Sequence, residues 1–162
     1  MAHTSELLDY TTNAFIVKDK QVLLVFNKTY NSWFGPGGHI EKDEDIQKAL
    51  FREIEEETGI SRKELQIILP PGNSVSENIF SDMTGEVLTN PHHIDIHQVS
   101  PTHHHLAFRY FFKTTANFTG SQDASVTKLK WFSLKELDDP KYNLKKHVKF
   151  YAKEAIKLSQ YA

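Results

Sequence analysis

The chain has 162 residues, of which 39% are hydrophobic and 25% are charged, as in one ordinary globular domain. We therefore expect a single domain over residues 1–162. Nineteen Lys and Arg against twenty-one Asp and Glu give a formal net charge of −2, so no overall basic field attracts nucleic acid or anionic lipid. This balance argues against a nucleic-acid partner and favours a small molecule.

The sequence contains no cysteine, which excludes disulfides, zinc–thiolate sites and thiol nucleophiles and is compatible with a reducing compartment. Residues 1–10 lack the basic start and apolar run of a signal peptide, and no stretch approaches the roughly 18 apolar residues of a membrane span. We expect a cytoplasmic protein with no membrane partner.

The first third of the chain reads as strands followed by a helix. Two β-prone runs, 12–17 and 21–27, predict a hairpin, and the glycine- and proline-rich run 33–38 predicts a short strand that ends in a tight turn. An apolar stripe at helical spacing then predicts a helix over 44–58, with Gly59 as its C-terminal stop.

The rest of the chain alternates short strands with turns before a second long helix. We expect strands at 65–69, 92–100, 105–114 and 128–132, a turn-rich region at 70–91 with room for a further hairpin, a capped helical turn at 133–137 and a helix at 143–160. Strands with two interspersed helices indicate an α/β or α+β layered fold. The apolar stripe of the last helix fits packing on the sheet and packing in a homodimer equally well.

Three glutamates lie on one face of the first helix. Glu53, Glu56 and Glu57 stand at i, i+3 and i+4, where like charges destabilise a helix by a few tenths of a kcal/mol per pair. A glutamate run elsewhere would read as a solvated acidic face. Here the preceding Gly37-Gly38 turn can bring a backbone carbonyl close, and carboxylate and carbonyl oxygens are the ligands that Mg²⁺ or Mn²⁺ prefers.

The stretch 38–60 carries a longer pattern. A glycine is followed by a glutamate six residues on, then by Arg-Glu, an aliphatic residue, two glutamates, a glycine and an aliphatic residue, and all nine positions are filled within twenty-three residues. This pattern resembles the signature of the Nudix hydrolase family. Flanking residues 33–38 and the Trp131-Phe132 pair extend the resemblance over roughly 12–137, which leaves the final helix outside it.

The resemblance implies a mixed β-sheet sandwiched between helices, with the signature as a loop-helix-loop. It also implies a metal-dependent hydrolase that cleaves a phosphoanhydride bond in a nucleoside di- or triphosphate derivative, by attack of water at phosphorus. Carried over by position, Glu53, Glu56 and Glu57 would bind Mg²⁺, with Mn²⁺ as a substitute, and one of them could also deprotonate the water. The family does not fix which one.

The remaining signature positions would support the site. Arg52 would hold the glutamates by charge-assisted hydrogen bonds, and Glu44 would support the loop or the metal site. Gly38 and Gly59 would allow the two turns, and Gly38 would offer its carbonyl to the metal.

Candidate substrate contacts come from outside the helix. His93 and His97 alternate with isoleucines as on a strand with one wet face, which we expect to line the pocket, and Arg109 is the best candidate for a phosphate contact. A histidine-rich surface without a catalytic task is the alternative. Trp33 and Phe34 could stack on a base or belong to the core.

A further acidic base or metal ligand could come from outside the signature, at Glu77, Glu86, Asp95 or Asp123. Two other functions stay open: a non-catalytic nucleotide-sensing module and an RNA 5′-end pyrophosphohydrolase. The sequence does not separate ADP-ribose, dinucleoside polyphosphates, sugar nucleotides and nucleoside triphosphates as substrates.

Overall fold

The computed structural model describes residues 7–69, 72 and 83–162. Its centre is an eight-stranded mixed sheet with the order β3-β2-β1-β7-β5, in which β4 pairs with β1, β6 with β7 and β8 with β2. The strands are β1 Leu8–Lys18, β2 Gln21–Asn27, β3 Ser32–Phe34, β4 Gly37–His39, β5 Leu65–Ile67, β6 His93–Ser100, β7 His103–Thr114 and β8 Val126–Ser133. The layered, mixed-sheet class predicted from the sequence is confirmed.

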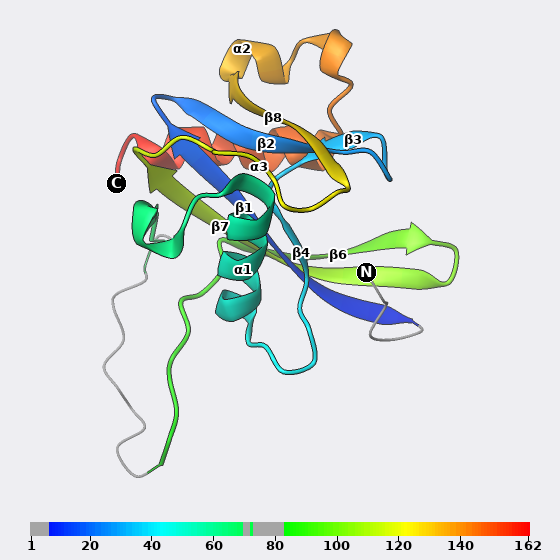
Figure 1. Cartoon of the computed structure of the whole chain (residues 1–162), viewed down its shortest axis with the longest axis vertical. Coiled ribbons are helices and arrows are strands. Elements are labelled where there is room, and N and C mark those ends of the chain that lie inside the picture. Colours follow the sequence, from blue (N-terminus) through cyan, green and yellow to red (C-terminus); the bar gives the residue numbers. More distant parts are fainter. Residues whose placement is uncertain (1–6, 70–71, 73–82) are drawn as a thin grey trace.

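Helices cover the sheet from both sides, with α1 (Ile46–Thr58) in front of it and α3 (Lys146–Ser159) behind it (Figure 1). The alternation of β1 explains the two layers, because successive side chains point to opposite faces. Ala14 and Ile16 pack in the cluster that includes Leu50 of α1, whereas Phe15 packs in the cluster that includes Ala152 of α3. The long parallel pairing of β1 with β7 joins the two halves of the sheet.

The ends of α1 differ slightly from the prediction. The helix begins at Ile46 rather than 44, because the Asp45 side chain accepts hydrogen bonds from the backbone N–H groups of Gln47 and Lys48. It ends as expected at Gly59, whose φ of 74° lies in the left-handed region. A tight connection follows, with the 3-10 turn η1 at Arg62–Glu64.

The C-terminal segment covers the face of the sheet opposite to α1. Ser133 caps the short helix α2 (Leu134–Leu137) in a capping box with Glu136, and the 3-10 turn η2 follows at Pro140–Tyr142. The last helix begins at Lys146 rather than 143, since Asn143 adopts a left-handed conformation with φ 46°. Its buried stripe, centred on Tyr151 and Ala152, covers the sheet. A homodimer stays a prediction.

The turn-rich region at 70–91 falls largely outside the described residues, and so does the hairpin that it could hold. Of the helices in the described part of the chain, none has the length and apolar character needed to cross a membrane.

Candidate active site

The three signature glutamates lie at the face of α1 turned toward β4. Glu53 and Glu57 are 1% and 3% exposed, whereas the side chain of Glu56 is 47% exposed. Glu57 Oε2 accepts a hydrogen bond of 2.9 Å from the N–H of Gly37. A Cβ on Gly38 would stand 2.5 Å from Glu53 Oε1, so only glycine allows this approach of strand and carboxylate.

Arg52 ties the glutamates to the loop in front of the helix. Its guanidinium donates to both carboxylate oxygens of Glu44, at 2.5 and 2.8 Å, and to Glu53 Oε1 at 2.9 Å. It also donates to the carbonyl of His39 at 3.2 Å and reaches Glu56 at 3.4 Å. Such a fork fixes orientation as well as charge, which suits the positioning role expected for this arginine.

Burial removes water from the carboxylates of Glu53 and Glu57 and so disfavours their charged forms. Loss of water raises the pKa of Glu57 to about 8, with further repulsion from Glu53 and Asp123. Burial also raises the pKa of Glu53, although Arg52 opposes that shift. In contrast, the hydrogen bond from Arg52 lowers the pKa of Glu44. Arg52 therefore pairs with Glu53, whereas Glu57, among the described residues, is met only by the N–H of Gly37.

Asp123 is the outside acid that the fold brings to this site. It repels both buried glutamates, while its own Oδ1 accepts a hydrogen bond from the N–H of Ser125 in the segment before β8. Of the other three candidates, Asp95 belongs to a different network, Glu86 is exposed, and Glu77 lies outside the described residues. Sequence spacing gave no reason to prefer Asp123, because its approach depends on the path of the loop.

The packing of Trp33 favours its alternative as a core residue over base stacking. Trp33 is 8% exposed and makes edge contacts with the rings of Phe26, Phe132 and Tyr142. Phe34 is only partly buried. The ammonium of Lys145 lies 4.9 Å from its ring centroid, and Tyr30 contacts the ring edge-on, so Phe34 is partly covered by its neighbours.

The prediction that the polar face of β6 is the wet one is wrong. Ile94 and Ile96 are 59% and 62% exposed, whereas the face with His93, Asp95 and His97 is half-buried. The reason is α3, which covers this side of the sheet. Its Tyr151 hydroxyl donates to Asp95 at 2.7 Å, and its Glu154 carboxylate lies 2.5 Å from His93 Nε2.

Arg109 is likewise held within the protein. Its guanidinium donates to both oxygens of Asp95, at 2.9 and 3.3 Å, and to Asn13 Oδ1 at 2.7 Å, and its side chain is 7% exposed. Burial opposes ionisation of Asp95, but hydrogen bonds from His97, Arg109 and Tyr151 bring its pKa below the usual range. The charge that we expected to meet a phosphate is thus already paired. Neither Asn13 nor Tyr151 was expected from the sequence.

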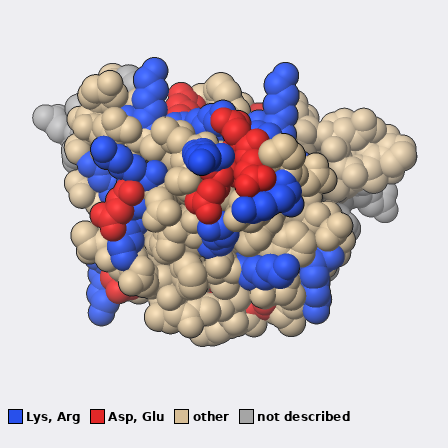
Figure 2. Space-filling model, turned by 90° about the horizontal axis from the view of Figure 1, so that it is seen from above, with Lys and Arg blue, Asp and Glu red and all other residues tan. Residues whose placement is uncertain are grey.

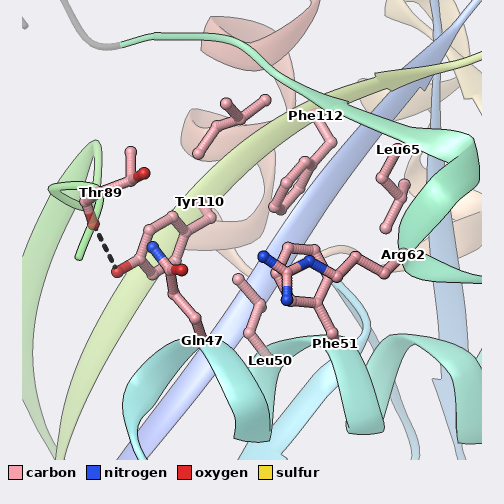
Figure 3. A pocket seen from close by; sticks show the side chains of 9 residues that line it. Gln47, Leu50, Phe51, Arg62, Leu65, Thr89, Tyr110 and Phe112 are labelled. Carbon is pink, nitrogen blue, oxygen red and sulfur yellow. Dashed lines mark hydrogen bonds between the residues drawn. The ribbon is translucent and has the colours of Figure 1, made fainter. Parts of the chain in front are cut away.

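A small pocket opens on the other side of α1, between that helix, η1, β5 and β7 (Figure 3). Its walls mix apolar and polar side chains, with Leu50 and Phe51 from the helix and Phe112 from β7 beside Gln47 and Arg62, and the hydroxyl of Tyr110 donates to the carbonyl of Thr89 at its edge. None of the signature glutamates lines it, so it is separate from the carboxylate site.

Comparison with known proteins agrees with this geometry. The family model described as NUDIX domain matches residues 8–153. The chain belongs to the NUDIX family. The match includes more than half of α3, so the motif-based extent of the resemblance, which ended near 137, was too short.

Solved and curated proteins place the chain among NUDIX hydrolases. A NUDIX-family hydrolase from Clostridium perfringens superimposes with a TM-score of 0.76 at 30% identity, covering 93% of this chain and 97% of that one. Two Bacillus subtilis (strain 168) proteins match over 53 residues: "Putative 8-oxo-dGTP diphosphatase", 42% identical over 31% of this chain and 36% of that protein, and "Uncharacterized Nudix hydrolase YvcI", 38% identical over 33% and 34%. The chain spans about a third of the length of these curated relatives.

Proposed function

We propose that this NUDIX domain, acting as one unit over 1–162, hydrolyses a phosphoanhydride bond in a nucleoside di- or triphosphate derivative with the help of a divalent cation. One observation carries the proposal: the buried Glu53 and Glu57 lie beside the Gly37-Gly38 backbone and are repelled by Asp123, with Glu56 on the same helical face. Among the described residues, Arg52 is the cation that reaches Glu53 and Glu56. Such a surplus of negative charge suits a metal ion and its phosphate ligand.

The donor set fits Mg²⁺, with Mn²⁺ as a substitute. Carboxylate oxygens and the carbonyl of Gly38 are hard ligands, and no cysteine exists to favour a softer metal. The raised pKa of Glu57 points the same way, because a nearby cation would favour the ionised form. When bound, the cation would neutralise charge on the phosphates and make a water molecule more acidic.

The chain's own residues then have distinct tasks. The N–H of Gly37 binds one oxygen of Glu57 and leaves the other for the metal or the water. Arg52 holds the carboxylates of Glu53 and Glu44 in place. Once a cation keeps it ionised, a buried glutamate with one oxygen held by a backbone N–H is suited to accept a proton from the attacking water through its other oxygen. Glu57 is therefore our first candidate for the general base.

The substrate is expected to be a small nucleotide that the enzyme meets in the cytoplasm. On the face shown in Figure 2, lysine and arginine side chains are interspersed with acidic ones rather than gathered into one basic patch, which does not favour an RNA 5′-end substrate. The name of one curated relative makes oxidised nucleoside triphosphates a natural first class to test. Phe34 is the candidate for base stacking, and His93, His97 and Arg109 stay candidates for phosphate or sugar contacts.

The test is hydrolysis of a nucleotide panel at mildly alkaline pH with Mg²⁺ or Mn²⁺, against EDTA, with release of phosphate or nucleoside monophosphate as the signal. Glu57→Gln removes the proposed base, and Glu55→Gln is the matched control because Glu55 is exposed on the same helix. Metal-dependent turnover that Glu57→Gln abolishes and Glu55→Gln keeps is the expected result. Inactivity on the whole panel, with a nucleotide still raising the melting temperature, would instead favour the sensing module.

A further inference from the structure

A second cluster of metal-binding residue types lies beside the glutamate site. Asp9 of β1 and His105 of β7 are direct partners in the parallel pair, and His39 of β4 faces Thr11, two residues along β1 from Asp9. Residues two apart on a strand share a face, so three strands bring these side chains together on one side of the sheet. The rings of His39, His97 and His103 contact the ring of His105, but the sequence did not predict that Asp9 and His39 would join this group.

The distances have the scale of a coordination sphere. One donor atom from each of Asp9, His39 and His105 lies within 4.8 Å of the other two. His39 Nε2 and Asp9 Oδ2 are 3.3 Å apart. Adjacent ligands of a tetrahedral ion with bonds of about 2.0–2.1 Å are roughly 3.3 Å apart, so the Asp9–His39 pair already has the required separation.

The local chemistry also favours a cation. Asp9 is 0% exposed, and His105 Nε2 is buried without a hydrogen-bond partner among the described residues. A fully buried carboxylate and a buried imidazole nitrogen are both groups that a bound cation would satisfy. A third histidine near this carboxylate, His103, places its Nε2 3.2 Å from Asp9 Oδ2.

We propose that Asp9, His39 and His105 form a binding site for a transition-metal dication, with Zn²⁺ as the best match. Zinc accepts a set of two imidazoles and one carboxylate, whereas magnesium prefers a set made of oxygens only, and a fourth position is left for water or a ligand atom. His103 lies 3.2 Å from the carboxylate oxygen and would orient it, as outer partners of metal ligands do.

The site is adjacent to the glutamates but distinct from them. Strand β4 separates the two, since Gly38 meets Glu53 whereas the next residue, His39, supplies the imidazole. The carbonyl of His39 also accepts a hydrogen bond from Arg52. Zinc held by His39 would therefore restrain the backbone carbonyl to which Arg52 donates a hydrogen bond.

The experiment is a Zn²⁺ titration of the full chain without an affinity tag, in competition with a chromophoric chelator, followed by a Co²⁺ titration read by visible absorption. The informative variants are His105→Gln and His39→Gln. His104→Gln is the matched control, because His104 is the next residue of β7 and points to the other face. Thermal melting in EDTA establishes that each variant is folded, and Glu57→Gln shows whether the signature glutamates take part.

We expect one Zn²⁺ per chain in the wild type, His104→Gln and Glu57→Gln, with an intense Co²⁺ spectrum and no displacement by excess Mg²⁺. Loss of an outer partner weakens metal affinity by about 10- to 100-fold, which is the expectation for His103→Gln, and folded His105→Gln or His39→Gln should lose more than that. Unchanged zinc affinity in either folded variant, or loss of zinc in Glu57→Gln, would overturn the proposal.

Discussion

The carboxylates of the half-buried Asp95 and the buried Glu57 differ in which neighbours meet their charge. Asp95, between β6 and α3, receives hydrogen bonds from Arg109, Tyr151 and His97, and its pKa falls below the usual range. Glu57, on α1, receives one backbone N–H, and its pKa rises to about 8. The charge of Asp95 is therefore met within the protein, whereas the proposed cation would be needed to meet that of Glu57.

The largest expected effect is on the hydrolysis rate and comes from removing the charge of Glu57. Glu57→Gln should lower the hydrolysis rate by roughly 10²- to 10⁴-fold, because charge stabilisation and positioning dominate the barrier in phosphoryl transfer. Steady-state kinetics on the best panel substrate measures this loss. A variant that retains more than a tenth of the wild-type rate, with Glu55→Gln also active, would remove Glu57 from the mechanism.

Removal of a charge from the Asp95 network should lower the stability of the fold rather than the hydrolysis rate. Arg109→Ala leaves Asp95 half-buried without its cation, and we expect a loss of about 2–4 kcal/mol in the free energy of unfolding, measured by urea denaturation. The double variant Arg109→Ala/Asp95→Ala should lose less than the sum of the two single changes. A raised KM with unchanged stability would show instead that Arg109 contacts substrate.

The two sites should also differ in their response to pH. Between the ordinary pKa of 4.5 and the folded value of about 8, the folded chain keeps a proton on Glu57 that the unfolded chain has released. Stability of the metal-free protein should therefore fall as pH rises from 4.5 to 8, by a few kcal/mol, relative to Glu57→Gln. Denaturation in EDTA at pH 5 and pH 8 measures the difference, and equal slopes for both proteins would contradict it.

The smallest expected effect comes from the loss of one hydrogen bond to Asp95. Tyr151→Phe removes the donor to Asp95 and should cost about 1 kcal/mol of stability, without a change in metal dependence. Tyr30→Phe is the control, because Tyr30 is 51% exposed. A loss in Tyr151→Phe no greater than that in the control would show that Asp95 does not need this partner.

The glutamate site could be predicted because its parts are close in sequence. Helical spacing places Glu53, Glu56 and Glu57 together, and the Gly37-Gly38 pair precedes them by a short loop, so local rules suffice. The long strands and both long helices follow from the same rules, with end points shifted by capping at Asp45 and the turn at Asn143.

The polar network could not be predicted because its parts meet only through the sheet. The register that sets Arg109 opposite Asn13, and the helix that covers Asp95, depend on contacts far apart in the chain. Alternation along β6 is equally compatible with either face being covered. The alternation along β6 was therefore predicted correctly, whereas the face that is exposed was predicted wrongly.

The most direct test of the central claim is anomalous diffraction from crystals of the wild type grown with Mn²⁺. We predict a peak among the carboxylates of Glu53, Glu56 and Glu57 beside the carbonyl of Gly38, and its absence in Glu57→Gln. Wild-type crystals with no manganese at these carboxylates, in a protein that hydrolyses nucleotides with Mn²⁺, would contradict the account.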